Sequence, residues 1–257
     1  MSNPSNLPQP SESRDELSND DNWSRRNLNR VAGVTLMVIS VLMIALMMHH
    51  PTAGGHDMHS FLEGIESIQT LNVIVHGGAL IILLLLGSCM SALSSSLGTS
   101  SATVRLGAVF YAAGLLNMFA AATVSGFLVP GFAGTLAGAT SEQLTAGGQI
   151  LHLLREINRT CDEFGVLGMS AGIFWWSLRM CLQNQARFVG ILGVIAGAGG
   201  VVGLFSGHLG ATLHGVLGFV LVQGVWNVLV GVGLIRNWWN ASLADSPQSM
   251  IRQAETS

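Results

Sequence analysis

The chain has 257 residues, of which 49% are apolar and only 10% are charged, and its formal net charge is −3. An ordinary soluble domain carries about 25% charged residues, so this composition excludes one and indicates a lipid environment. All eleven basic residues are arginine, which excludes a lysine Schiff base and a phosphate-binding lysine. Because the arginines form no basic patch, we expect no nucleic acid partner.

Residues 1–28 are rich in serine, asparagine, proline and acidic side chains, and this composition predicts a disordered cytoplasmic tail. The apolar run 31–48 follows directly after three arginines. It is longer than the apolar part of a secretory signal peptide, and no Ala-x-Ala cleavage site follows it. We therefore interpret 31–48 as a first membrane helix that is retained.

Five further apolar runs follow along the chain, at about 71–93, 104–129, 160–182, 188–205 and 213–235. A membrane-spanning helix needs roughly 20 apolar residues. The sequence therefore predicts an all-α fold, a polytopic transmembrane helical bundle with six spans over residues 29–236. Residues 237–257 are polar again and are expected to form a C-terminal cytoplasmic tail.

The arginines predict the orientation of the bundle. With both termini in the cytoplasm (N-in/C-in), nine arginines lie inside, and only Arg155 and Arg159 lie on the outer half. This bias follows the positive-inside rule for membrane proteins. We expect a multi-pass protein in a lipid bilayer, and the absence of lysine together with the retained first span fits a bacterial inner membrane best.

On this topology all eight histidines fall in the non-cytoplasmic half of the protein. They come from several separate segments, namely His49, His50, His56 and His59 near the first outer loop, His76 in the second span, His152 at the start of the fourth, and His208 and His214 around the last outer loop. We expect their rings to gather in one layer near the outer membrane surface, and this clustering is the main functional signal in the sequence.

The first outer loop, residues 47–59, combines four histidines with three methionines, Met47, Met48 and Met58. Imidazole suits copper, zinc, iron and nickel, and thioether suits copper(I), so His49, His50, His56 and His59 are candidates for a second metal site. His59 and Glu63 are four residues apart and would share one helix face. The alternative is a polar loop at the membrane interface with no metal.

His76 is expected about 7–8 Å below the outer surface, five residues into the second span. A histidine at this depth needs a partner and is a functional hypothesis by default. The alternative is a hydrogen bond between helices, worth around 1 kcal/mol. Gly77 and Gly78 follow it and would leave space for another backbone or for a flat cofactor.

The start of the fourth helix carries two polar faces, one with His152, Glu156, Arg159 and Glu163 and an adjoining one with Arg155, Asn158 and Asp162. His152 and Glu156 are four residues apart and could ligate one metal. Glu156 is also our candidate catalytic residue, because a carboxylate beside a metal can help to activate water. The alternatives are ion pairs from Arg159 to Glu156 and Glu163, and an amphipathic helix lying before a span that begins at Phe164.

His208 and His214 bracket the shortest outer loop, so their rings could converge on one centre. Further into the membrane, Gln223, Asn227 and Asn117 could extend a polar path, although such residues more often link helices by hydrogen bonds. The glycine repeat of the fifth span predicts close helix packing. Signatures of hydrolases, dinucleotide-binding proteins and c-type haem proteins are absent, and the three cysteines are widely spaced.

Three functions compete on this basis. In the first, His76, His152, His208 and His214, with Glu156, bind a transition metal (copper, zinc or iron) or haem b for redox or metal-assisted chemistry. In the second, the same outer groups serve a small proton-coupled transporter or permease; against it, the inner halves of the spans hold no acid or histidine. In the third, the protein is an accessory subunit whose outer polar groups dock other membrane subunits.

Overall fold

The computed structural model describes residues 12–51, 57–184, 186–207 and 213–239. The described residues form helices and contain no strand, which confirms the all-α prediction. The elements are α1 (Glu12–Met48), α2 (Met58–Leu97), α3 (Ala102–Thr123), a π-helix η1 (Val124–Leu128), α4 (Val129–Gly134), α5 (Ser141–Leu182), α6 (Arg187–Phe205) and α7 (Leu213–Ile235). Since α3, η1 and α4 run on as one segment, six segments are long and apolar enough to cross a membrane, as predicted.

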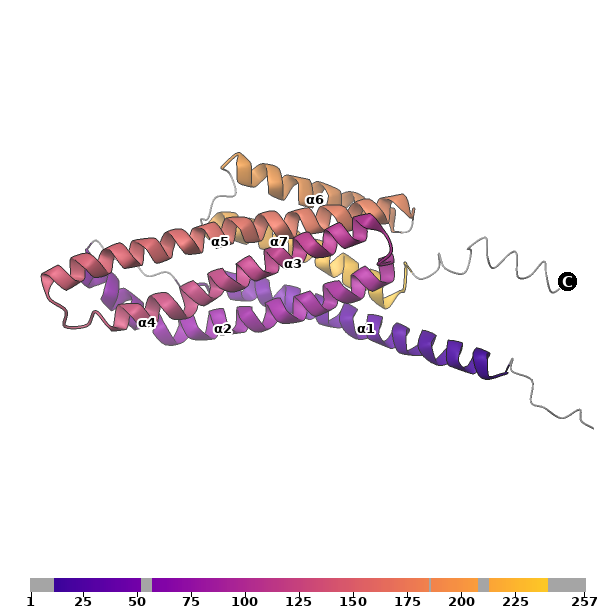
Figure 1. The fold of residues 1–257 in the computed structure, drawn as a ribbon, viewed down its shortest axis with the longest axis horizontal. Coiled ribbons are helices and arrows are strands. Elements are labelled where there is room, and N and C mark those ends of the chain that lie inside the picture. Colours follow the sequence, from indigo (N-terminus) through magenta and orange to yellow (C-terminus); the bar gives the residue numbers. More distant parts are fainter. Residues whose placement is uncertain (1–11, 52–56, 185, 208–212, 240–257) are drawn as a thin grey trace, which may run out of the picture.

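The helices run side by side along one long axis (Figure 1). The start of α1 and the end of α7 lie at the same end of the bundle, which we name the terminal end. The opposite end holds the end of α1 and the starts of α2 and α5, and we name it the histidine end. Which side of the membrane each end faces stays a prediction. Helix α5 packs between α3 and α6, and α1 packs against α7 and α2.

Two helices are much longer than a membrane span. Helix α2 has 40 residues and α5 has 42. At 1.5 Å per residue each is roughly 60 Å long, about twice the 30 Å hydrocarbon core of a bilayer. Both extend beyond α6 and α7 at the histidine end (Figure 1). The predicted spans 71–93 and 160–182 are therefore only the apolar parts of these helices, and their polar first turns form a projection.

Capping residues explain why α2 and α5 begin before their apolar parts. At the start of α2, Asp57 Oδ1 accepts a hydrogen bond of 2.8 Å from the backbone N–H of Ser60. At the start of α5, the backbone N–H of Thr140 donates to Gln143 Oε1 at 2.8 Å. Each pair forms a capping box, which satisfies backbone donors that the first helical turn leaves free.

The first helix also begins earlier than predicted. Residues 12–28, which we expected to be part of a disordered tail, belong to α1. This stretch contains neither proline nor glycine. Once the apolar part of α1 has formed, adding further turns costs little, because the costly step in helix formation is nucleation. Residues 1–11 of the predicted N-terminal tail and 240–257 of the C-terminal one lie outside the described residues.

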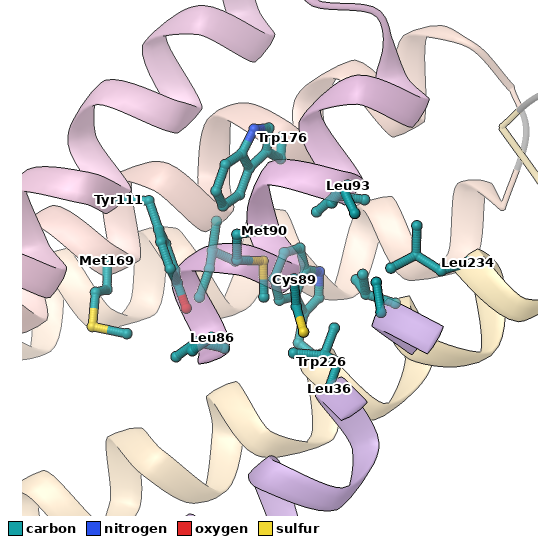
Figure 2. Close-up of a cluster of buried hydrophobic side chains, with 14 of the residues drawn as sticks. Leu36, Leu86, Cys89, Met90, Leu93, Tyr111, Met169, Trp176, Trp226 and Leu234 are labelled. Atoms are coloured by element: carbon teal, nitrogen blue, oxygen red, sulfur yellow. The ribbon is translucent and has the colours of Figure 1, made fainter. Parts of the chain in front are cut away.

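The terminal half of the bundle is tightly packed. Figure 2 shows Leu36, Leu93 and Leu234 gathered around Trp226, with Trp176 close by. Each of these five side chains is at most 1% exposed. These side chains form the apolar core of the terminal half.

Candidate functional site

A first cavity of about 270 Å³ lies within the histidine half of the bundle, between α1, α2, α3, α5 and α7. Its walls are largely apolar. Its titratable lining side chains, among the residues that the structure describes, are His50, His76 and Asp162. These three side chains come from the end of α1, from α2 and from α5. The cavity therefore brings ionisable groups from three parts of the sequence into an apolar space.

A second cavity of about 380 Å³ lies between α2, α4 and α5, in the projection at the histidine end. It is lined by Met58, His152 and Arg155 among others. Four polar residues line both cavities, namely His50, His76, Ser125 and Asn158, and we name them the junction residues. The outer cavity thus meets the inner one at a polar junction.

The two junction histidines contact each other. The ring centroids of His50 and His76 are 5.0 Å apart, and the rings meet edge to face at 73°. His76 is 5% exposed, and its Nδ1 donates to the backbone carbonyl of Asn72 at 2.9 Å. A carbonyl only accepts, so in the neutral ring Nδ1 carries the proton and Nε2 keeps its lone pair.

His50 differs from His76 in its hydrogen bonding. Its Nδ1 is buried and has no hydrogen-bond partner within the described ranges. Burial lowers the pKa of His50 below its ordinary value, and the nearby His76 lowers it further, while the backbone of Pro51 acts weakly in the opposite direction. His50 is therefore neutral at pH 7.

The π-helix η1 provides the seat for His76. In η1 the backbone N–H of Val129 donates to the carbonyl of Val124, and Pro130 has no N–H. The Ser125 carbonyl is therefore left without a helical donor, and the neighbouring Gly126 carbonyl also lies within reach of α2. The side-chain amide of Asn72 donates to both, with Nδ2 lying 3.0 Å and 3.2 Å from the two carbonyl oxygens. Asn72 therefore links η1 to the same turn of α2 that holds His76.

Gly126 allows this close approach. A Cβ atom at this position would meet Cβ of His76 far inside van der Waals contact. Only glycine lets η1 pack directly on the histidine. Single-turn π-helices often mark functional sites, and here the π-helix and the histidine share one contact.

A short hydrogen-bond chain continues from the junction into α5. Ser125 Oγ lies 2.7 Å from Asn158 Oδ1, and Asn158 Nδ2 donates to Asp162 Oδ2 at 3.3 Å. The prediction that Asn158 and Asp162 share one face of α5 is consistent with this contact. The chain places a carboxyl group in the wall of the inner cavity, close to the histidines.

The deep wall of the inner cavity is formed by α7. Gln223 and Asn227 line it, and Gln223 Nε2 donates to the Tyr111 hydroxyl at 2.7 Å. Asn227 Oδ1 is buried and has no partner in the described part of the chain. Asn117, the third residue of the predicted polar path, lines neither cavity and donates to Ala113 in its own helix.

The other histidines of the first loop do not reach the junction where the structure describes them. His49 is exposed and its Nδ1 donates to the carbonyl of Ala45 at 2.9 Å. His59 Nδ1 lies 3.3 Å from Glu63 Oε1 in an exposed pair, as the spacing of four predicted. His56 and His208 lie outside the described residues, as does the side chain of His214.

The fourth-span candidates are divided between two surfaces. His152 is exposed and lines only the outer cavity. Glu156, our candidate catalytic residue, lines neither cavity and lies 3.8 Å from Arg159 Nη1. Arg159 also donates to Glu163 at 3.0 Å, so the ion-pair alternative describes this face.

The structure offers no support for the metal or haem site that was predicted from the histidine and carboxylate side chains. Over the described ranges, no three side chains of histidine, cysteine, aspartate and glutamate gather closely enough to hold a metal ion. His50 and His76 are already in ring contact, so no porphyrin fits between them. The sites that include His208 and His214 stay predictions, because those side chains lie outside the described residues.

Comparisons of the chain with known protein families, with curated proteins and with solved structures found no match in any of the three. Function is therefore inferred from the geometry of the two cavities. The residues that shape their junction include three that the sequence did not point to, namely Asn72, Ser125 and Gly126. A signal was present, because Asn72 precedes His76 by one helical turn and Pro130 follows Gly126 by four residues.

Proposed function

We propose that the protein is a membrane permease that admits a small solute from the non-cytoplasmic face. The observation that carries this proposal is the pair of cavities sharing His50, His76, Ser125 and Asn158. The outer cavity lies in the projection beyond the apolar spans, where water reaches it on the predicted topology. The inner cavity lies between the apolar spans and continues from the same four residues.

The closed terminal half supports a cycle in which access alternates between the two faces. Trp176 and Trp226 pack in that half and block any route onward. Yet Ser170 Oγ, Ser177 Oγ and Trp226 Nε1 are buried there without partners in the described part of the chain. Unpaired buried polar atoms are costly. Helix movement that opens the terminal half would expose them to water and relieve that cost, as expected of a permease.

The junction histidines supply the means to couple solute movement to protons. His50 is neutral at pH 7, and both histidines line the wall that a solute passes. Uptake of a proton by either ring would place a positive charge at the contact between them. The edge-to-face arrangement would then separate, since like charges or a desolvated cation are unfavourable there. His76 and His50 therefore form the gate in this proposal.

Side-resolved thiol labelling tests the permease directly. In a cysteine-free variant, Asn227→Cys is exposed to a membrane-impermeant thiol reagent from each face in turn. The permease predicts a fast reaction from the non-cytoplasmic face and a slower one from the cytoplasmic face, as the inward-open state is visited. Reaction from the non-cytoplasmic face alone would indicate a one-sided binding protein, and absence of reaction from both faces would contradict the cavity itself.

A further inference from the structure

We infer that the solute is a soft monovalent metal ion, copper(I), bound by methionine thioethers together with the junction imidazoles. This inference rests on the proposed function and names the cargo of the same cavity. It differs from the first-loop site considered above, because its ligands line the cavity between the spans and include Met43 and His76. Thioether sulfur and imidazole nitrogen together favour copper(I), whereas magnesium, calcium and manganese prefer oxygen ligands.

The ligand stripe lies at the end of α1. Met43, Met47 and His50 follow one another at intervals of four and three residues, and all three line the inner cavity. The spacing of four places Met43 and Met47 on one face of α1, and His50 follows two residues after the helix ends. Met48 and His49, which lie between Met47 and His50 in the sequence, line neither cavity; Met48 is 70% exposed and His49 is also exposed. The last turns of α1 and the residue that follows them therefore present two thioethers and an imidazole to the cavity.

Each of the two junction imidazoles has a ring nitrogen that is available to bind a metal ion. His76 donates from Nδ1 to the carbonyl of Asn72, which leaves Nε2 with a free lone pair. This is the usual arrangement of a metal-binding histidine, whose second nitrogen donates to a backbone carbonyl. His50 Nδ1 is a buried nitrogen without a partner in the described part of the chain, and it sits in the same ring contact.

Methionine side chains also line the cavities on both sides of the junction. Met118 and Met169 line the inner cavity from α3 and α5, and Met58 lines the outer one. The carboxyl in the inner wall, Asp162, is instead hydrogen-bonded by Asn158. A series of weak, exchangeable thioether ligands suits an ion that must enter and leave. A methionine-lined cavity also suits an adaptable organic ligand, but such a ligand does not call for two facing imidazoles.

The test is copper(I) binding by the purified full-length protein, measured by competition with a chromophoric copper(I) chelator. All variants are made in the cysteine-free background, since free thiols would bind the ion themselves. The inference predicts saturable binding that excess zinc does not displace. His50→Gln and Met47→Ile should each weaken it by about tenfold or more, on the scale seen when metal sites are disturbed.

Two neighbouring substitutions serve as matched controls. His49→Gln and Met48→Ile remove an imidazole and a thioether from neighbouring exposed positions. Both should leave the copper(I) affinity unchanged. Monodisperse elution of each variant shows that the bundle is folded, and Met43→Ile replaces any variant that fails this check. Absent binding, or equal losses in the control variants, would overturn the inference. If Asn227→Cys still reacts from both faces in that event, the permease stands and its cargo is organic.

Discussion

His76 is held by contacts from three directions. Its Nδ1 donates to Asn72, the backbone of Gly126 lies against its Cβ, and the ring of His50 meets its edge. A side chain fixed in this way presents its free nitrogen in one place and one tautomer. Positioning of this kind is what a binding site on rigid elements requires.

Gly126→Ala tests the close contact between η1 and His76. The added methyl group meets Cβ of His76 and must push the two segments apart. Overpacking of this kind costs about 1–3 kcal/mol, so the unfolding free energy in detergent should fall by that amount. Gly131→Ala is the matched control, because a Cβ there has open space around it. Equal stability of the two variants would contradict the contact.

The pH dependence of stability should report on His50. Because its pKa in the folded protein lies below the ordinary value, the unfolded chain takes up the proton first as pH falls. Stability is therefore lost as pH drops below about 6.5 and is unaffected by this group above it. Thermal unfolding at pH 7.5 and pH 5.5 measures the loss, which should be smaller in His50→Gln and unchanged in His49→Gln. An identical pH profile in all three proteins would refute the assignment.

At the scale of elements, the π-helix η1 is the feature that organises the site. Pro130 ends the α-helical hydrogen bonding of the third span four residues after Gly126. Whichever helical register the backbone takes, one carbonyl in this turn lacks a donor. The chain satisfies it with Asn72 from the neighbouring helix, and in doing so connects the third span to the turn of α2 that carries His76.

Asn72→Leu should therefore destabilise the bundle more than an equivalent change elsewhere. It leaves the carbonyl of Ser125 without a donor, at a cost of about 1–3 kcal/mol. Asn117→Leu is the control, since the Asn117 amide donates only within its own helix. Chemical unfolding of both variants measures the difference. A loss in Asn117→Leu as large as that in Asn72→Leu would argue against the link between helices.

The sequence predicted the apolar parts of the elements well, because a 20-residue apolar run has few alternatives in a bilayer. The helical class is confirmed, and so are six helices long and apolar enough to span a membrane. The fourth helix was expected to begin near His152, but α5 begins at Ser141, because the cap at Thr140 starts the helix earlier than the apolar pattern indicates. The helical residues 12–28 were missed because composition alone favours disorder there.

The site was predicted only in part. The depth of His76 indicated a functional residue, and it lies at the junction of the two cavities. Glu156 and His152 were grouped with it because spacing on a helix says which residues share a face but not what that face meets. The contacts of Asn72 and Gly126 depend on how α2 and the third span are aligned against each other. This alignment could not be predicted from the sequence alone.

At the scale of the whole molecule, the orientation in the membrane is a prediction from the arginines. Ser141→Cys at the histidine end and Ser100→Cys at the terminal end are both exposed positions. In the cysteine-free background, an impermeant thiol reagent added to the non-cytoplasmic face of intact cells should label Ser141→Cys and spare Ser100→Cys. The reverse pattern would place both termini outside and invert the direction of the permease.

The central claim is that the junction connects an outer cavity to one between the spans, and blocking it provides the most direct measurement. Asn227→Cys is combined either with Ser125→Phe, which fills the junction, or with Ser88→Phe on the exposed face of α2. The rate of thiol labelling from the non-cytoplasmic face is then compared. We predict that Ser125→Phe abolishes most of the reaction while Ser88→Phe leaves it unchanged. Equal labelling rates in the two double variants would contradict a route through His50 and His76.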